Sequence, residues 1–223
     1  VDLTGETVDE VVSRGKHLLM RVGEFSIHSH LKMEGSWHIY RDGSKWYRPE
    51  WQARAILAND TYTTVGFQLG LLEIVPRDQE HTVVGYLGPD LLGPDWDADV
   101  ALANLTADPT REVGLALLDQ RVMAGLGNVY RAELCFLRGI LPTRPVGEVD
   151  QPQKLVELAQ RLIEANNARP QRTTTGNLRG DRLWVYGRAG KPCLRCGTAI
   201  LRGELGDTAL QLRDTWWCPN CQT

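Results

Sequence analysis

The sequence predicts a multidomain α+β protein with three parts: an N-terminal antiparallel β-sandwich, a helical domain and a C-terminal β-hairpin module. Three observations carry this prediction. Short apolar segments broken by turn residues fill positions 16–75, helical spacing of apolar residues follows beyond position 96, and four of the five cysteines lie between positions 193 and 221. Alternation with a period of two indicates strands, and steps of three and four indicate helices.

The β-sandwich is predicted over residues 1–88. Its apolar segments are separated by turn residues such as Gly23-Glu24 and Asn59-Asp60, as expected for antiparallel strands joined by short connections. The predicted strands are His17–Val22, Phe25–Leu31, Trp37–Tyr40, Ala53–Ala58 and Tyr62–Phe67.

A stretch rich in glycine, proline and aspartate then interrupts regular structure, and a helical domain is predicted over residues 96–170. The Asp108-Pro109 pair is typical of a helix start. Asp150 and Pro152 predict a second helix, with apolar residues at three- and four-residue steps along one face.

A glycine-containing segment, Met123–Glu133, lies between these two helix starts. Two glycines separated by one residue allow a tight turn, and Asn128 is placed to cap a helix that Gly139 ends. The pattern predicts a helix, two turns and a second helix. The following helical run contains Cys135, which we interpret as a small core residue.

The last part of the chain comprises a basic linker, residues 171–192, and the cysteine module, residues 193–223. We expect a strand at Leu183–Tyr186 and two more, Ala199–Leu205 and Leu210–Trp217, joined near Gly206-Asp207.

Charge is distributed unevenly along the chain. The whole sequence has a net charge of -3, which argues weakly against nucleic-acid binding, but nine Lys/Arg and four Asp/Glu after position 168 give the C-terminal part an excess of positive charge. A basic region of this kind suits a polyanion, and a solvated surface without a partner is the alternative.

The chain has no apolar run of the length that spans a bilayer and no basic-then-apolar start typical of a secretory signal. We therefore expect a cytoplasmic protein with no membrane partner, acting as a monomer.

The four C-terminal cysteines form two Cys-x-x-Cys pairs, Cys193 with Cys196 and Cys218 with Cys221, separated by 21 residues. Two intervening residues let both thiolates of a pair face one ion, and a hairpin brings the pairs together. This spacing predicts one structural Zn²⁺ with four thiolate ligands. The alternatives are two disulfides or a redox pair. Arg213, near the start of the returning strand, is a candidate phosphate ligand, or else a surface arginine without a role.

Together these segments resemble the formamidopyrimidine-DNA glycosylase / endonuclease VIII family. The segment Gly125–Glu133 with its flanking residues is similar to the helix-two-turns-helix motif of that family, and Pro192–Gln222 is similar to its zinc finger. Ser13–Leu19 and His30–Ser36 resemble two segments of its β domain. The apolar sequence Thr64–Phe67, where the formamidopyrimidine branch carries an Arg-Phe-Gly loop, favours the endonuclease VIII branch.

The resemblance implies an enzyme that holds duplex DNA containing damaged bases or abasic sites and flips the damaged base out of the stack. Lys16, Asn128 and Arg213 match the family's phosphate-binding residues, and Met33 matches its wedge residue, which fills the space left by the base. For Lys16 an ordinary strand-edge lysine, for Asn128 a plain helix cap and for Met33 a core methionine are the alternatives. Glu133 is interpreted as a structural hydrogen-bonding partner.

The family's reaction uses an N-terminal proline as nucleophile and an adjacent glutamate, followed by strand cleavage. Position 1 is valine and position 2 aspartate, so no catalytic residue is assigned within these 223 residues, and we expect the β-sandwich to be incomplete. Two interpretations follow: a glycosylase and abasic-site lyase for oxidised bases, pyrimidines in particular, whose N-terminal segment lies upstream of Val1, or a shortened, inactive zinc-dependent protein that binds damaged DNA. A zinc-stabilised protein-interaction module is a third class.

Overall fold

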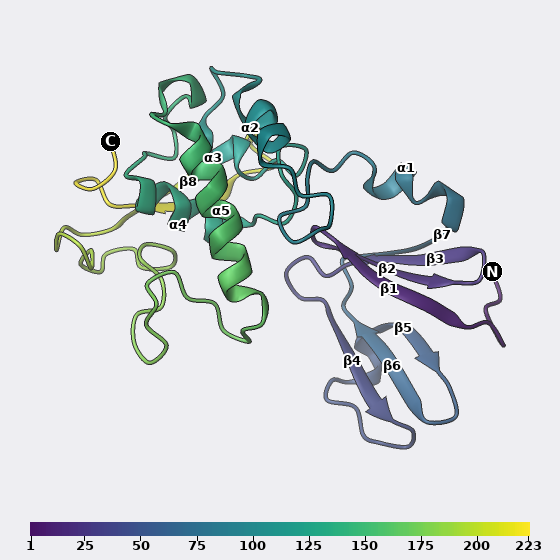
Figure 1. Cartoon of the computed structure of the whole chain (residues 1–223). Helices are drawn as coiled ribbons and strands as arrows, with labels where there is room; N and C mark the ends of the chain where they lie inside the picture. The colour runs from purple at the N-terminus through teal and green to yellow at the C-terminus, as the bar shows by residue number, and fades with distance from the viewer. The chain divides into compact units, whose positions relative to one another are not determined.

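The computed structural model describes residues 1–223, which form two compact units, Val1–Tyr86 and Leu87–Thr223 (Figure 1). None of the helices has the combination of length and apolar character that spanning a bilayer requires. The predicted combination of antiparallel sheets, a helical domain and a cysteine-bearing hairpin is confirmed.

The first unit contains two antiparallel sheets. One has the strand order β1-β2-β3-β7 and the other the order β4-β6-β5. The strands are β1 (Val8–Arg14), β2 (His17–Val22), β3 (Phe25–His30), β4 (Ser36–Arg41), β5 (Ala53–Ala58), β6 (Tyr62–Phe67) and β7 (Leu71–Pro76). The five predicted strands are present, and β1 and β7 are additional.

Trp37 and Leu57 of the second sheet pack against Met20, Val22 and Ile27 of the first, so the core of this unit lies between the two sheets. The short helical turns η1 (Glu50–Gln52), η2 (Arg77–Gln79) and α1 (His81–Val84) complete the unit.

The hairpin between β1 and β2 positions one predicted site residue. Arg14 pairs with His17, so the turn consists of Gly15 and Lys16 alone. Gly15 has φ = 59°, a conformation that glycine adopts without steric cost, and glycine at the first central position is typical of a type II′ hairpin turn. Lys16 therefore lies at the tip of a tight turn.

The second unit is built around four helices, and its main core lies between them. They are α2 (Ala98–Thr106), α3 (Val113–Ala116), α4 (Asn128–Arg138) and α5 (Pro152–Asn167), with η3 (Val146–Glu148) between the last two. Helix α4 ends at Gly139, which has φ = 69° in the left-handed region, as the sequence predicts.

Two of the predicted helix starts are wrong in detail. The Asp108 side chain accepts hydrogen bonds from the backbone and hydroxyl of Thr110 and forms a turn, so helix α3 begins only at Val113. Asp150 does not cap helix α5, which is preceded by Gln151 and has its proline in the first turn.

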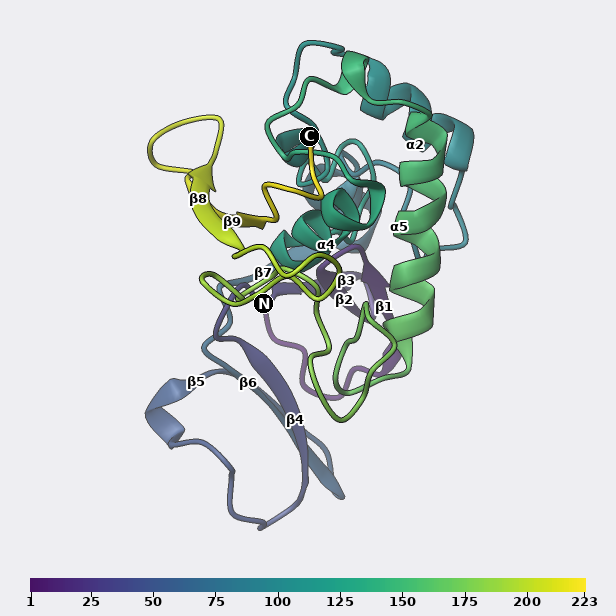
Figure 2. The ribbon, with the colours of Figure 1, turned by 90° about the vertical axis from the view of Figure 1, so that its left-hand side faces the viewer.

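The C-terminal hairpin consists of β8 (Leu201–Leu205) and β9 (Arg213–Trp217), which pair antiparallel. Strand β9 packs beside helix α4 (Figure 2). A second core, formed by Ala132 and Phe136 of α4 with Val185, Ile200 and Trp216, joins the hairpin to the helix. The hairpin is thus a part of the helical unit.

Candidate metal centre and nucleic-acid interface

The four predicted cysteine ligands converge at the base of the hairpin. Their Sγ atoms all lie within 4.8 Å of one another. The Sγ atoms of Cys196 and Cys218 are 3.4 Å apart and those of Cys193 and Cys221 4.0 Å apart. These separations exceed the S–S bond of about 2.05 Å, which excludes disulfides in this structure. Tetrahedral coordination with Zn–S distances of about 2.3 Å requires S···S separations of about 3.8 Å, so the residues fit a metal ion.

Residues next to the cysteines connect the two pairs to helix α4 and to the segment just after it. The guanidinium carbon of Arg195, within the first pair, lies 4.4 Å from the ring centroid of Phe136 on α4. Gln222, which follows the second pair, donates from Nε2 to the carbonyl of Ile140 at 2.9 Å and accepts from the backbone N–H of Cys218 at 2.8 Å. A metal bound here fixes the hairpin relative to α4.

Asn128 lies at the start of α4 but does not cap it, which corrects the sequence prediction. The N-cap is Gly127, without a side-chain cap hydrogen bond. Asn128 instead donates from Nδ2 to the backbone carbonyl of Asp214 in β9 at 2.9 Å, and its Oδ1 has no protein partner. Arg131 donates to the same carbonyl at 2.7 Å. One main-chain oxygen of the hairpin therefore receives two donors from α4.

Arg213, which precedes Asp214 in the sequence, is exposed at the start of β9. Burial lowers the pKa of Arg131 to about 10, and the positive charge of Arg213 contributes to the decrease. Asn128 and Arg131 thus both contact the main chain of the residue that follows Arg213. The carboxylate of Asp214 forms an ion pair with the guanidinium of Arg202, with 2.6 Å between them.

Glu133, five residues after Asn128 in helix α4, is fully buried and organises the segment before the first cysteine pair. Its carboxylate accepts hydrogen bonds from the backbone N–H groups of Trp184, Val185 and Tyr186, at 2.8–2.9 Å, and from the hydroxyl of Thr174. The predicted strand at Leu183–Tyr186 is therefore wrong, because these N–H groups bind a carboxylate and not a neighbouring strand. The structural interpretation of Glu133 agrees with this geometry.

The two remaining predicted residues belong to the first unit. Lys16 lies in the β1–β2 turn, partly buried, and not along a strand edge. Met33 lies in the turn between β3 and β4 with 87% of its surface exposed, so it is not a core methionine. The side chain is available to an external partner.

The residue after Lys16 belongs to a hydrogen-bonded chain that sequence reasoning missed. His17 contacts His28 at 2.7 Å, His28 contacts the carboxylate of Glu73 at 2.9 Å, and the hydroxyl of Tyr86 lies 3.2 Å from His17 Nε2. Arg131 was missed too, although it stands three residues after Asn128 and so shares its helix face. The histidines gave a weaker signal. Alternation predicts that they lie on two strands of one sheet, but it does not predict the register in which β2 and β3 pair.

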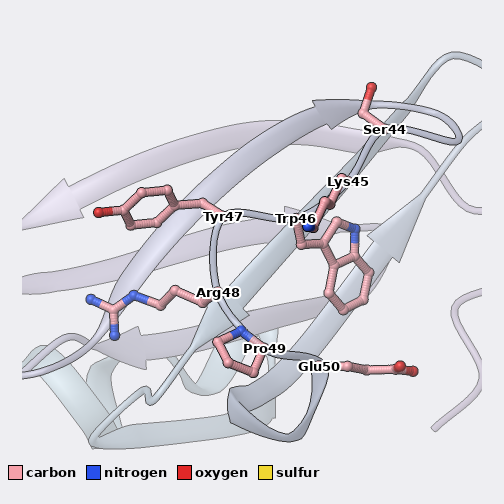
Figure 3. Close-up of a pocket in the computed structure, with 7 residues that line it drawn as sticks. All are labelled: Ser44, Lys45, Trp46, Tyr47, Arg48, Pro49 and Glu50. Atoms are coloured by element: carbon pink, nitrogen blue, oxygen red, sulfur yellow. The ribbon is translucent and has the colours of Figure 1, made fainter.

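A surface cavity of about 560 Å³ lies in the loop after β4 and contains none of the predicted site residues. Figure 3 shows the side chains of Tyr47 and Arg48 extending to one side of this loop and those of Trp46 and Glu50 to the other. The ring of Trp46 contacts that of Phe67, with 5.8 Å between centroids, so the loop covers one face of the second sheet.

Comparison with known proteins agrees with this arrangement. Residues 87–169 match the formamidopyrimidine-DNA glycosylase H2TH domain and residues 1–70 the N-terminal domain of the same glycosylase. The chain is 53% identical to an endonuclease 8 2 of Mycobacterium tuberculosis, over 100% of the chain and 86% of that protein. It is also 53% identical to a DNA-(apurinic or apyrimidinic site) lyase of Mycolicibacterium smegmatis, over 100% of the chain and 85% of that protein.

Among solved structures, the complex of the Lactococcus lactis Fpg with DNA containing an abasic site matches with a TM-score of 0.81 at 25% identity, covering 99% of this chain and 83% of that one. Two antiparallel sheets, a helix-two-turns-helix unit and a four-cysteine hairpin, in this order, define a class of DNA-repair glycosylases and lyases. The chain belongs to the formamidopyrimidine-DNA glycosylase / endonuclease VIII family, and its 53% identity to an endonuclease 8 confirms the predicted branch.

Proposed function

We propose that the chain holds duplex DNA at damaged or abasic sites as the binding body of a base-excision glycosylase with lyase activity, directed at oxidised bases and at pyrimidines in particular. The observation that carries the proposal is the double contact of Asn128 and Arg131 with the Asp214 carbonyl. It fixes the main chain beside Arg213, whose side chain is exposed, relative to the start of α4, where helix N–H groups favour an anion.

In this proposal Lys16, Asn128 and Arg213 bind DNA phosphates. Lysine supplies a point charge and arginine a planar donor fork, both suited to phosphate oxygens. Met33 enters the space left by the flipped base, because an unbranched apolar side chain slides between bases at low steric cost. None of the 223 residues is assigned the role of nucleophile.

The ion proposed for the cysteine centre is Zn²⁺, since four thiolates in tetrahedral arrangement are typical of structural zinc sites. All four positions are filled by protein, so the ion acts by holding the hairpin and not by activating water.

Binding to an oligonucleotide duplex with a central abasic-site analogue tests the proposal. We expect salt-dependent binding that is tighter than to the undamaged duplex. Arg213→Ala should weaken binding and leave the zinc content unchanged. It should also reduce the slope of log affinity against log salt concentration by the amount expected for one phosphate contact. Arg161→Ala, which removes an exposed arginine of α5, serves as the matched control. Equal effects of the two substitutions would remove Arg213 from the contact residues.

Borohydride trapping on DNA with an oxidised pyrimidine separates the enzyme from the inactive binding protein. We expect the 223-residue chain to bind this DNA without forming a trapped adduct. A protein extended upstream of Val1 to an N-terminal proline should form the adduct, since a secondary amine gives a reducible Schiff base. An extended protein that binds but is never trapped would contradict the glycosylase assignment.

A further inference from the structure

The turn between β3 and β4 holds a lysine in an unusual backbone conformation. Lys32 has φ = 55°, in the left-handed region that non-glycine residues seldom adopt. Its backbone N–H donates to Nδ1 of His30 at 2.8 Å, and the N–H of Gly35 donates to the carbonyl of Leu31 at 2.9 Å. These contacts fix the direction in which the Lys32 side chain leaves the turn.

The stem of Lys32 rests against Gly70, the residue just before β7. A Cβ added at Gly70 would lie 2.1 Å from Cγ of Lys32 and 2.6 Å from its Cβ. Gly70 is itself tied to β3, because its N–H donates to the carbonyl of His30 at 3.1 Å. Any larger residue at position 70 must therefore displace the lysine.

The ammonium groups of Lys32 and Lys16 act on the same imidazoles. Burial is the largest cause of the lowered pKa values of His17 and His30, and both lysines add to the decrease through their positive charge. The nearby carboxylate of Glu73 is paired with His28, and Lys32 forms no ion pair. Lys32 thus adds a positive charge to this region that no carboxylate of the first unit pairs with.

We propose that Lys32 is a second phosphate-binding residue of the first unit, positioned by Gly70, which holds the DNA backbone beside the nucleotide that Met33 displaces. The assignment rests on the proposed function. Lys32 precedes the exposed Met33 directly, so a phosphate bound by Lys32 lies next to the base step that the methionine enters.

The test measures duplex binding against salt concentration for Lys32→Gln, Gly70→Ala and the double variant. Lys154→Gln, at an exposed lysine of α5, is the matched control. Loss of one phosphate contact lowers the slope by about 0.9 and the affinity about eightfold near 0.1 M salt. We expect this loss for Lys32→Gln and for Gly70→Ala, no further loss in the double variant, and recovery with Lys32→Arg.

The outcomes separate this assignment from the proposed function. Wild-type protein without salt-dependent duplex binding would contradict the proposed function itself. A different result would overturn the role of Lys32 alone. In that case the wild type binds, Lys16→Gln weakens binding, and Lys32→Gln binds no more weakly than the control Lys154→Gln. Loss in Gly70→Ala that adds to that of Lys32→Gln overturns the positioning role of Gly70. Thermal unfolding of each variant identifies any loss that comes from misfolding.

Discussion

His17 and His28 are hydrogen-bonded to each other inside the first unit, with 2.7 Å between Nδ1 of His17 and Nε2 of His28. With the Glu73 carboxylate accepting from His28 and the Tyr86 hydroxyl donating to His17, all four groups are satisfied when both imidazoles are neutral. A proton added at Nε2 of His17 would reverse the contact with Tyr86, whose hydroxyl would then accept, and would place a positive charge on a buried ring.

The first prediction concerns the pH dependence of stability. Burial and neighbouring positive groups lower the pKa of His17 to about 4, against about 6.5 in an unfolded chain. The unfolded state therefore binds more protons below pH 6.5, and stability falls as the pH decreases toward 4. Between pH 7.5 and 5.0 we expect the free energy of unfolding to fall by about 2 kcal/mol, which urea unfolding of the whole chain at each pH would measure.

His17→Phe should reduce this loss, because it removes the titrating group. His81→Gln, at an exposed histidine, should leave the loss unchanged. Identical pH dependence in wild type and His17→Phe would show that His17 is not the group responsible.

The second prediction concerns metal removal. Chelation should free the four thiols of the hairpin to react with a thiol reagent and abolish DNA binding, because β9 and Arg213 lose their fixed position. Cys135 should stay unreactive, since its burial raises the pKa of its thiol to about 12. Zinc content well below one equivalent in protein purified without added metal, or five reactive thiols in the folded chelated protein, would contradict this.

The third prediction concerns Glu133. The Glu133 carboxylate accepts hydrogen bonds from three backbone N–H groups, and Glu133→Gln places an NH₂ donor against some of these donors. The substitution should lower the free energy of unfolding by about 3 kcal/mol. Limited proteolysis should then cut the segment around Val185 faster. Glu157→Gln, on the exposed face of α5, is the control and should leave both stability and proteolysis as in wild type.

The fourth prediction concerns Met33. Met33→Ala should change stability by less than about 0.5 kcal/mol, because the side chain is exposed. A 2-aminopurine reporter opposite or beside the lesion should nevertheless show less base unstacking, and Met33→Leu should restore most of it. Equal reporter signals for wild type and Met33→Ala would exclude the wedge role.

The sequence predicted the strands best where alternation and turn residues agree, as in β2, β3, β5 and β6. It missed β1, whose residues are mostly exposed, so its few apolar side chains give little alternation to detect. It missed α2 because a nine-residue helix capped by Asp97 follows directly on a glycine- and proline-rich stretch. The false start at Asp108 has a physical reason, since the same side chain that caps helices also forms turns.

The site was predictable where it depends on residue type and spacing, and not where it depends on tertiary contact. The cysteine spacing alone indicated a metal ligand set, and the four Sγ atoms do converge. The burial of Arg131 was not predictable, because arginine is seldom fully buried and its partner is a main-chain oxygen more than 80 residues away. No side-chain pattern encodes such a contact.

That main-chain oxygen has a consequence for variation among relatives of this protein. Because the joint between α4 and the hairpin uses the carbonyl of residue 214, substitutions of Asp214 leave the joint intact, whereas an insertion or deletion between Arg213 and Cys218 shifts the carbonyl out of register. Selection on this joint therefore acts on the length of β9 and on the two donors in α4, while the identity of the residue that supplies the acceptor is free to drift.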